Sequence, residues 1–162
     1  MNRVLIIDDS TSIRKLLNRL LISKKYNIEQ AVDAFDGMDK IISFKPNVIL
    51  LDISMPGKSG IELCKELKSN IKTNNIYIIM LTVYRSGVDE THGFDAGADD
   101  YICKPFSPRE VVARVKAVLR RTSGDITTKA RGLILDEPRY QATLNGIDLG
   151  LTAVEFKLLS FL

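Results

Sequence analysis

A run of four apolar residues at positions 48–51 is bounded by Asn47 on one side and by an acid, Asp52, on the other. Four residues are too few for a stable helix, whereas a short uninterrupted apolar run is typical of a strand covered on both faces in a parallel sheet. An acid at the end of such a strand stands where open α/β sheets bind ligands. Asp52 is therefore a candidate functional residue, the alternative being that it only caps a turn.

The same alternation of an apolar run and an amphipathic segment recurs five times over residues 1–122. The strands are expected near residues 4–7, 26–32, 48–51, 76–81 and 101–103. Alternating strands and helices favour right-handed crossovers and one parallel sheet with helices on both faces. The sequence therefore predicts an α/β fold, a doubly wound five-stranded parallel sheet in the order 2-1-3-4-5.

Helical periodicity predicts which residues of the intervening segments face the sheet. In the first helix the apolar stripe consists of Ile13, Leu16, Leu17, Leu20 and Leu21. In the second helix we expect Met38, Ile41 and Ile42 to point inward. A weak helix is expected at about residues 87–96, and the last helix is expected from about Ser107 to Arg121.

Polar residues follow the strands at one rim of this sheet: Asp8 and Asp9, Asp52, Thr82 and Lys104. Two unit charges about 4 Å apart repel by roughly 4 kcal/mol at an effective dielectric constant of 20. Three neighbouring carboxylates therefore need protons, a metal or a cationic side chain. Oxygen ligands suit Mg²⁺, and a lysine and a hydroxyl suit phosphate oxygens. The set predicts a site where a phosphoryl group is bound to, or transferred onto, a carboxylate.

These residues, together with three further motifs, resemble the receiver domains of two-component response regulators. The motifs are Met55-Pro56-Gly57, residues 97–101 (GADDY) and Lys104-Pro105-Phe106. The resemblance implies that Asp52 accepts phosphate from a sensor histidine kinase and that the protein is a regulatory phospho-acceptor rather than an enzyme. It implies Mg²⁺ as cofactor, with Asp8 (through water), Asp9, Asp52 and the Ser54 backbone carbonyl as ligands.

The resemblance also implies roles for the other residues at this rim. Thr82 and Lys104 would hold the phosphoryl oxygens, and Thr82 and Tyr101 would form the switch. The Lys104–Pro105 peptide bond is expected to be cis, which only an X-Pro bond allows at a free-energy cost under about 1 kcal/mol. Val83 departs from the small residue usual in the family, and we expect it to slow phosphorylation by small donors.

Residues 132–135 (GLIL) and 151–159 (LTAVEFKLL) resemble the start of the winged-helix effector of the OmpR/PhoB subfamily. That resemblance implies that activation produces a homodimer through the face made by helix four, strand five and helix five. The residues that match its usual ion pairs are Asp95, Asp100, Arg114 and Lys116. Glu90, however, stands where a basic residue normally meets Glu110, and two acids repel. We therefore expect a weakened dimer, although exposed ion pairs contribute only about 0–1 kcal/mol each.

Beyond residue 122 the sequence changes character. We predict a receiver domain at 1–122, a linker at 123–131 and, at 132–162, the incomplete and mainly β start of a winged-helix effector domain, which this stretch resembles. Asn145-Gly146 is a hairpin signal, and Thr152 with Glu155 is a capping box. About 30 residues are too few for a core of their own, so this part is expected to be disordered, docked or swapped. We expect the sequence to be a truncated or interrupted form of a longer regulator that binds DNA through the missing part.

Composition limits the other function classes. The net charge of +3 does not argue for nucleic acid, and no apolar run approaches the roughly 18 residues of a membrane span. Cys64 and Cys103 form no CxxC motif and indicate a reducing cytoplasm. A dehalogenase-type phosphatase would need an acid at Ser54, and a flavodoxin-like binder would need a phosphate loop in place of Asp8-Asp9. A receiver that acts by phosphorelay or protein contact without DNA remains the alternative.

Overall fold

The computed structural model describes residues 2–83, 96–121, 133–136, 139–144 and 146–160. The predicted helix at 87–96 and the predicted linker at 123–131 therefore lie largely outside the described residues. Glu90 and Asp95 lie outside them as well. Within the described residues, no helix is both long enough and apolar enough to cross a membrane.

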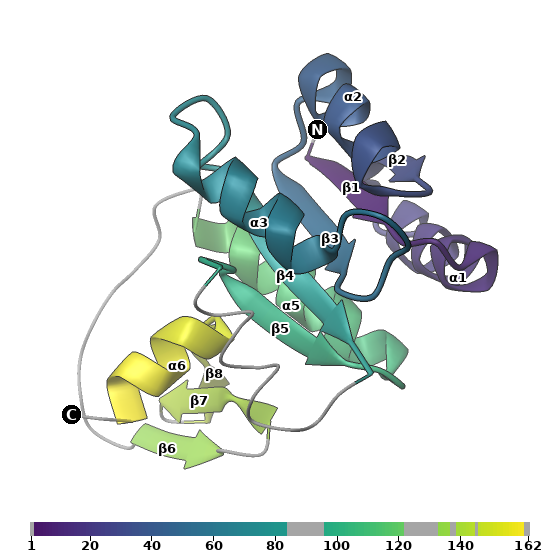
Figure 1. Cartoon of the computed structure of the whole chain (residues 1–162). Helices are drawn as coiled ribbons and strands as arrows, with labels where there is room; N and C mark the ends of the chain where they lie inside the picture. Colours follow the sequence, from purple (N-terminus) through teal and green to yellow (C-terminus); the bar gives the residue numbers. More distant parts are fainter. Residues whose placement is uncertain (1, 84–95, 122–132, 137–138, 145, 161–162) are drawn as a thin grey trace.

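A five-stranded parallel sheet forms the centre of the molecule (Figure 1). Its strands are β1 (Arg3–Ile7), β2 (Asn27–Ala31), β3 (Val48–Asp52), β4 (Tyr77–Thr82) and β5 (Asp100–Cys103). They pair in the order β2-β1-β3-β4-β5, which confirms the order predicted from the sequence. All five residues of the middle strand β3 are buried, as expected for an apolar run covered on both faces.

Among the described residues, two helices cover each face of the sheet. The helices α1 (Thr11–Ile22) and α5 (Pro108–Arg121) pack on one face, and α2 (Ala34–Phe44) and α3 (Gly60–Ser69) pack on the other. The inward positions predicted for the first two helices are partly wrong. Leu17, Leu21 and Ile41 are buried, but Leu16 is 40% exposed and Ile42 is 69% exposed. Neighbouring helical residues are about 100° apart around the axis, so one member of each pair faces water.

The approach of α3 to the end of β3 is unusually close. Ser59 caps α3 in a reciprocal capping box with Glu62, and Gly60 is the first residue of the helix. A Cβ atom at Gly60 would lie 2.1 Å from the carbonyl oxygen of Asp52. Only glycine therefore lets α3 start at this point, directly behind the strand end that carries Asp52.

The residues after position 132 form a small second unit beside β5 (Figure 1). An antiparallel sheet of β6 (Leu133–Asp136), β7 (Gln141–Leu144) and β8 (Ile147–Asp148) precedes α6 (Ala153–Ser160). We call residues 133–160 the C-terminal segment. Gly146 has a positive φ of 80° at the predicted hairpin turn, and Thr152 and Glu155 bond reciprocally as a capping box.

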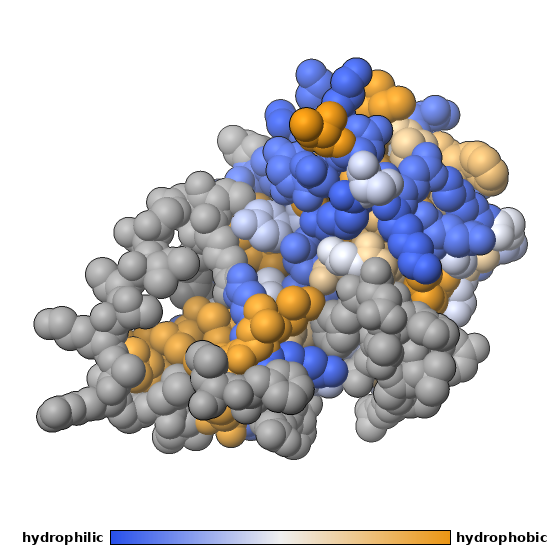
Figure 2. All heavy atoms as spheres, turned by 60° about the vertical axis from the view of Figure 1, so that its left-hand side comes forward, coloured by the Kyte–Doolittle hydropathy of each residue, from blue (hydrophilic) through white to orange (hydrophobic). Residues whose placement is uncertain are grey.

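The C-terminal segment keeps apolar surface of its own. Figure 2 shows apolar side chains gathered low in the view, over this segment, while the part of the molecule above is mostly hydrophilic. Among the side chains of this segment that the structure describes, the most exposed large apolar ones are Ile147, at 70%, and Leu158, at 66%. We expected this segment to be disordered, docked or swapped. In the structure it is docked on the five-stranded unit, where α6 contacts β5.

Candidate functional site

Three carboxylates meet at the carboxyl end of the sheet. Asp8 and Asp9 follow β1, and Asp52 is the last residue of β3. One carboxylate oxygen from each of these residues lies within 4.8 Å of the others. Asp8 and Asp52 are buried, whereas Asp9 is exposed. The structure therefore brings together the three acids that the sequence singled out, with one of them open to solvent.

Lys104 supplies the positive charge among these acids. Its ammonium nitrogen lies 2.9 Å from Oδ2 of Asp8 and 3.2 Å from Oδ1 of Asp52. The Lys104–Pro105 peptide bond is cis, as predicted, and the Lys104 backbone N–H donates to the carbonyl of Thr82. This hydrogen bond joins Lys104, the residue after β5, to the end of β4. The Lys104 side chain extends from there towards the carboxylates.

The electrostatics of Asp52 are those of a buried acid near a second acid. Burial and the charge of Asp8 raise the pKa of Asp52 to about 6, although Lys104 and the Ser54 N–H act in the opposite direction. Burial alone would lower the pKa of Lys104, but the hydrogen bond to Asp8 and the charges of both carboxylates outweigh it and raise that pKa. Lys104 therefore stays charged. Its charge does not fully offset the effects of burial and of Asp8 on the Asp52 carboxylate.

Asp8 is held in place through its backbone as well as its side chain. The Ser10 N–H donates to Oδ1 of Asp8 at 2.8 Å, and the guanidinium of Arg14 donates to the Asp8 carbonyl at 2.7 Å. Arg14 also donates to Oγ1 of Thr11. The sequence did not reveal this role of Arg14, because a side chain that binds a backbone carbonyl requires no particular partner residue.

The remaining predicted residues lie around this cluster. Thr82 ends β4, one residue beyond Leu81, which pairs with Asp52, and is 1% exposed. Ser54 is exposed, and its N–H donates to Oδ1 of Asp52 at 3.4 Å. Tyr101, in β5, is 3% exposed and belongs to the core. Val83 follows β4 and is 57% exposed.

The donors of this cluster fit a hard divalent cation. All of the predicted ligand atoms are oxygens, two of the three carboxylates are buried, and burial together with the charge of Asp8 raises the pKa of Asp52. Mg²⁺ prefers oxygen ligands and keeps several waters, which the exposed side of Asp9 allows. A carboxylate beside an ammonium group, as Asp52 is beside Lys104, is also chemically suited to carry a phosphoryl group.

Three of the four residues predicted for a dimer face, Asp100, Arg114 and Lys116, lie among the described residues. Asp100 and Arg114 pair within one chain, with 3.7 Å between Nη1 and Oδ2, and both are buried. Because the C-terminal segment covers them, neither is available to a second copy in this conformation. Lys116 is exposed on α5, and Asp95 lies outside the described residues.

Comparison of the sequence with known proteins finds the same kind of protein along the whole chain. Residues 4–116 match the family described as "Response regulator receiver domain". The phosphate regulon transcriptional regulatory protein PhoB of Pseudomonas aeruginosa is 41% identical over 161 residues, which cover 98% of this chain and 70% of PhoB. The transcriptional regulatory protein ResD of Bacillus subtilis is 38% identical over 99% of this chain and 70% of ResD.

Solved structures agree with the sequence relatives. The response regulator DrrB, an OmpR/PhoB homologue from Thermotoga maritima, covers 100% of this chain with 72% of its own length, at a TM-score of 0.72 and 29% identity. The chemotaxis protein CheY4 of Vibrio cholerae matches 73% of this chain with 98% of its own, at a TM-score of 0.69 and 30% identity.

Proposed function

This chain belongs to the response regulators of two-component systems, in the OmpR/PhoB group, and from that membership we propose that Asp52 is the residue that accepts the phosphoryl group. The supporting observation is the position of its carboxylate. Asp52 ends the central strand, lies among two further acids, and accepts a hydrogen bond from Lys104. In the sheet, β3 with its terminal Asp52 lies between β1, which Asp8 and Asp9 follow, and β4, which ends in Thr82.

In the proposed reaction an oxygen of the Asp52 carboxylate attacks the phosphorus atom of the donor. A bond between that oxygen and phosphorus forms, the bond to the donor's leaving group breaks, and an acyl phosphate results. The nucleophile must be ionised, and a pKa of about 6 leaves Asp52 ionised at neutral pH. Lys104 and Thr82 would then donate to the phosphoryl oxygens.

Asp8, Asp9 and Asp52, with the backbone carbonyl of Ser54, would hold Mg²⁺, and Asp8 would reach it through water. When bound, the ion neutralises negative charge on the phosphoryl oxygens. Burial of Asp8 and its bonds from Ser10 and Arg14 fix the inner side of this ligand set, while Asp9 stays open to solvent. Ordered ligands of this kind need little rearrangement when the ion binds.

We propose the wider role from the same membership. Residues 1–122 would form the receiver, 123–131 the linker, and 132–162 the start of the effector domain. A sensor histidine kinase in the cytoplasm would supply the phosphoryl group, and Thr82 and Tyr101 would carry the change to the face around β5 and α5, where a homodimer would form. Binding to DNA would control transcription. The protein would act as a regulatory phospho-acceptor rather than as an enzyme on a separate substrate.

Labelling with acetyl phosphate and Mg²⁺, read by intact mass, tests the assignment of Asp52. The wild-type chain is expected to gain the mass of one phosphoryl group, and Asp52→Asn is expected to gain none. Asp39→Asn, which removes an exposed acid of α2, is the matched control and should label as the wild type does. Labelling of Asp52→Asn to the wild-type level would overturn the assignment.

A further inference from the structure

Arg14 reaches the acidic cluster from the first turn of α1. Its Nη1 donates to the backbone carbonyl of Asp8 at 2.7 Å, and its Nη2 donates to Oγ1 of Thr11 at 3.2 Å. The side chain is half-buried, and none of the ion pairs between described residues includes it. The guanidinium is therefore a double hydrogen-bond donor whose charge has no acidic side chain as partner among those residues.

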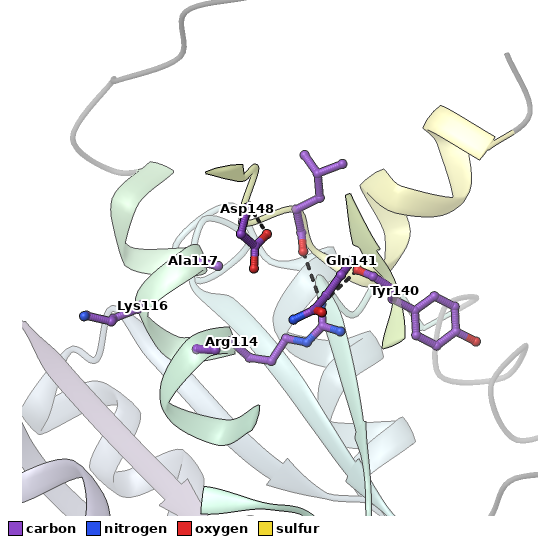
Figure 3. Close-up of a pocket in the computed structure, with 9 residues that line it drawn as sticks. Arg114, Lys116, Ala117, Tyr140, Gln141 and Asp148 are labelled. Atoms are coloured by element: carbon purple, nitrogen blue, oxygen red, sulfur yellow. Dashed lines mark hydrogen bonds between the residues drawn. The ribbon is translucent and has the colours of Figure 1, made fainter. Parts of the chain in front are cut away.

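Arg114 provides a contrast on α5. It too donates to main-chain carbonyls, which are those of Arg139, Tyr140 and Leu151 (Figure 3). Its charge, however, is paired with Asp100, with 3.7 Å between Nη1 and Oδ2. Arg14 binds only neutral oxygens, so its place is explained by the groups that it orients rather than by an ion pair.

The hydrogen bond from Arg14 fixes more than Asp8. A peptide group is planar, so a donor that holds the Asp8 carbonyl also fixes the N–H and the Cα of Asp9. The Ser10 N–H donates to Oδ1 of Asp8 at 2.8 Å, which closes an Asx turn around Asp9. Asp9 therefore lies between two peptide groups whose orientation is set by hydrogen bonds.

Asp9 depends on these bonds because its own carboxylate is not held. Asp9 is exposed, and no hydrogen bond or ion pair of its side chain occurs among the described residues. Asp8, by contrast, is fully buried, its backbone N–H donates to the carbonyl of Ala31, and its Oδ2 accepts from Lys104. Loss of the bond from Arg14 would leave Asp8 held by these contacts, but it would free the peptide that directs Asp9.

Two effects of Arg14 on a bound cation oppose each other. The positive charge of the guanidinium repels a cation at the three acids, although its half-exposed position screens this repulsion. The hydrogen bond to the carbonyl removes conformational freedom that Asp9 would otherwise lose when it becomes a ligand. Groups that orient metal ligands typically contribute about 10–100-fold to metal affinity, so the second effect should be the larger one.

We propose that Arg14 is a positioning residue of the cation site, which holds the Asp8–Asp9 peptide so that the Asp9 carboxylate faces the ion. The proposal rests on the proposed Mg²⁺ site. It predicts that the loss of this positive side chain weakens cation binding, whereas the loss of charge alone would strengthen it. Lys104 differs from Arg14, because its ammonium bonds to the carboxylates themselves.

Isothermal titration calorimetry of the full chain with Mg²⁺ tests the sign of this effect. For Arg14→Met we expect a dissociation constant at least about tenfold higher than for the wild type. Lys15→Met removes the charge of the next residue of α1, which is exposed, and should not raise the dissociation constant. An equal or lower dissociation constant in Arg14→Met would overturn the positioning role. A wild-type chain that binds no Mg²⁺ would instead overturn the cation site itself, and this inference with it.

Thr11→Val tests the same role without a change of charge. It removes the hydroxyl that accepts from Arg14 and should raise the dissociation constant for Mg²⁺ at least about twofold. Ser12→Ala removes an exposed hydroxyl of the same turn and should leave that constant unchanged. If Arg14→Met does not fold, Thr11→Val decides, and a dissociation constant equal to that of the wild type would overturn the role.

The Mg²⁺ dependence of acetyl phosphate labelling separates positioning from a merely structural role. In Arg14→Met the half-saturating Mg²⁺ concentration should rise at least about tenfold, while the labelling rate at saturating Mg²⁺ stays within about twofold of the wild type. A lower rate at saturating Mg²⁺ with an unchanged half-saturating concentration would show that Arg14 supports the fold and does not position Asp9.

Discussion

The ammonium of Lys104 lies 3.2 Å from Oδ1 of Asp52, the carboxylate that we propose as phospho-acceptor. The same nitrogen lies 2.9 Å from Asp8, so a single side chain serves as counter-charge for two of the three acids. A divalent cation that binds these acids must share them with Lys104. The strength of the cation site is therefore set partly by a residue that is not one of its ligands.

Removal of this counter-charge should strengthen cation binding. Lys104→Met leaves the three acids without a cationic partner, and we expect Mg²⁺ to bind at least about tenfold more tightly, which corresponds to about 1.4 kcal/mol. Isothermal titration calorimetry measures the affinity. Lys58→Met is the control, because Lys58 pairs with Glu66. Weaker Mg²⁺ binding in Lys104→Met would show that Lys104 supports the ligands more than it competes for them.

Asp52 should destabilise the metal-free fold at neutral pH. Its pKa rises from 3.8 in the unfolded chain to about 6 in the folded protein. Below pH 3.8 the carboxyl is protonated in both states and has no effect. Between these values only the unfolded state ionises readily, so stability falls as pH rises, and above pH 6 the full penalty is present. Asp52→Asn should thus stabilise the protein by about 3 kcal/mol at pH 7, and by little at pH 4.

Urea unfolding in buffer with a chelator measures this difference at both pH values. Asp39→Asn should change the free energy of unfolding little at either pH, because that acid is exposed. A stabilisation by Asp52→Asn that is equal at pH 4 and pH 7 would contradict the proposed origin of the effect.

Gly60 should tolerate no side chain. In Gly60→Ala the new Cβ would lie 2.1 Å from the Asp52 carbonyl oxygen and 2.9 Å from its carbon, so strand or helix must move. Such overpacking costs about 1–3 kcal/mol or more, and displacement of Asp52 should also slow acetyl phosphate labelling.

Gly37→Ala provides the comparison within the same protein. There the new Cβ would meet the terminal Cδ1 of Ile7 at 2.7 Å, and this flexible side chain can turn away. Alanine also favours a helix interior over glycine by about 1 kcal/mol, so the net change should be small. Denaturant unfolding of both variants measures the difference, and equal losses would contradict the steric argument.

Cys64 should be unreactive in the folded protein. Burial raises the pKa of its thiol to about 12, and the thiolate is the reactive form. Iodoacetamide at pH 8 should therefore leave Cys64 unmodified until urea unfolds the chain, as peptide mass mapping can measure. Modification of Cys64 in native buffer at the rate seen in urea would contradict this.

The sequence predicted the sheet and the acidic cluster because both follow from simple spatial rules. Apolar runs as short as residues 48–51 are typical of buried strands, and the carboxyl ends of parallel strands meet at one rim. Asp8, Asp9, Asp52 and Lys104 thus come together once the strand order is known. The hairpin at Gly146 was predictable for a similar reason, because its turn needs a positive φ.

What the sequence did not reveal are contacts made to the main chain. Arg14 binds the carbonyl of Asp8, and Arg114 binds carbonyls of the C-terminal segment. Every residue has a carbonyl, so no pattern of residue types marks the partner. The sequence therefore indicated a pairing of Arg114 with Asp100, but not its bonds to the main chain. The exposure of Ile42 was missed because periodicity shows which side of a helix is apolar. It does not show how much of that side the neighbouring sheet covers.

The hydrogen bonds that Arg114 donates to main-chain oxygens have an evolutionary consequence. Side chains at positions 139 and 151 can be exchanged without loss of these hydrogen bonds, since each bond ends on an atom common to all residues. Arg114 and Asp100 have no such freedom. The side chains that specify these hydrogen bonds thus lie on one side of the contact, and residues 139 and 151 could diverge over many generations while the same bonds persist.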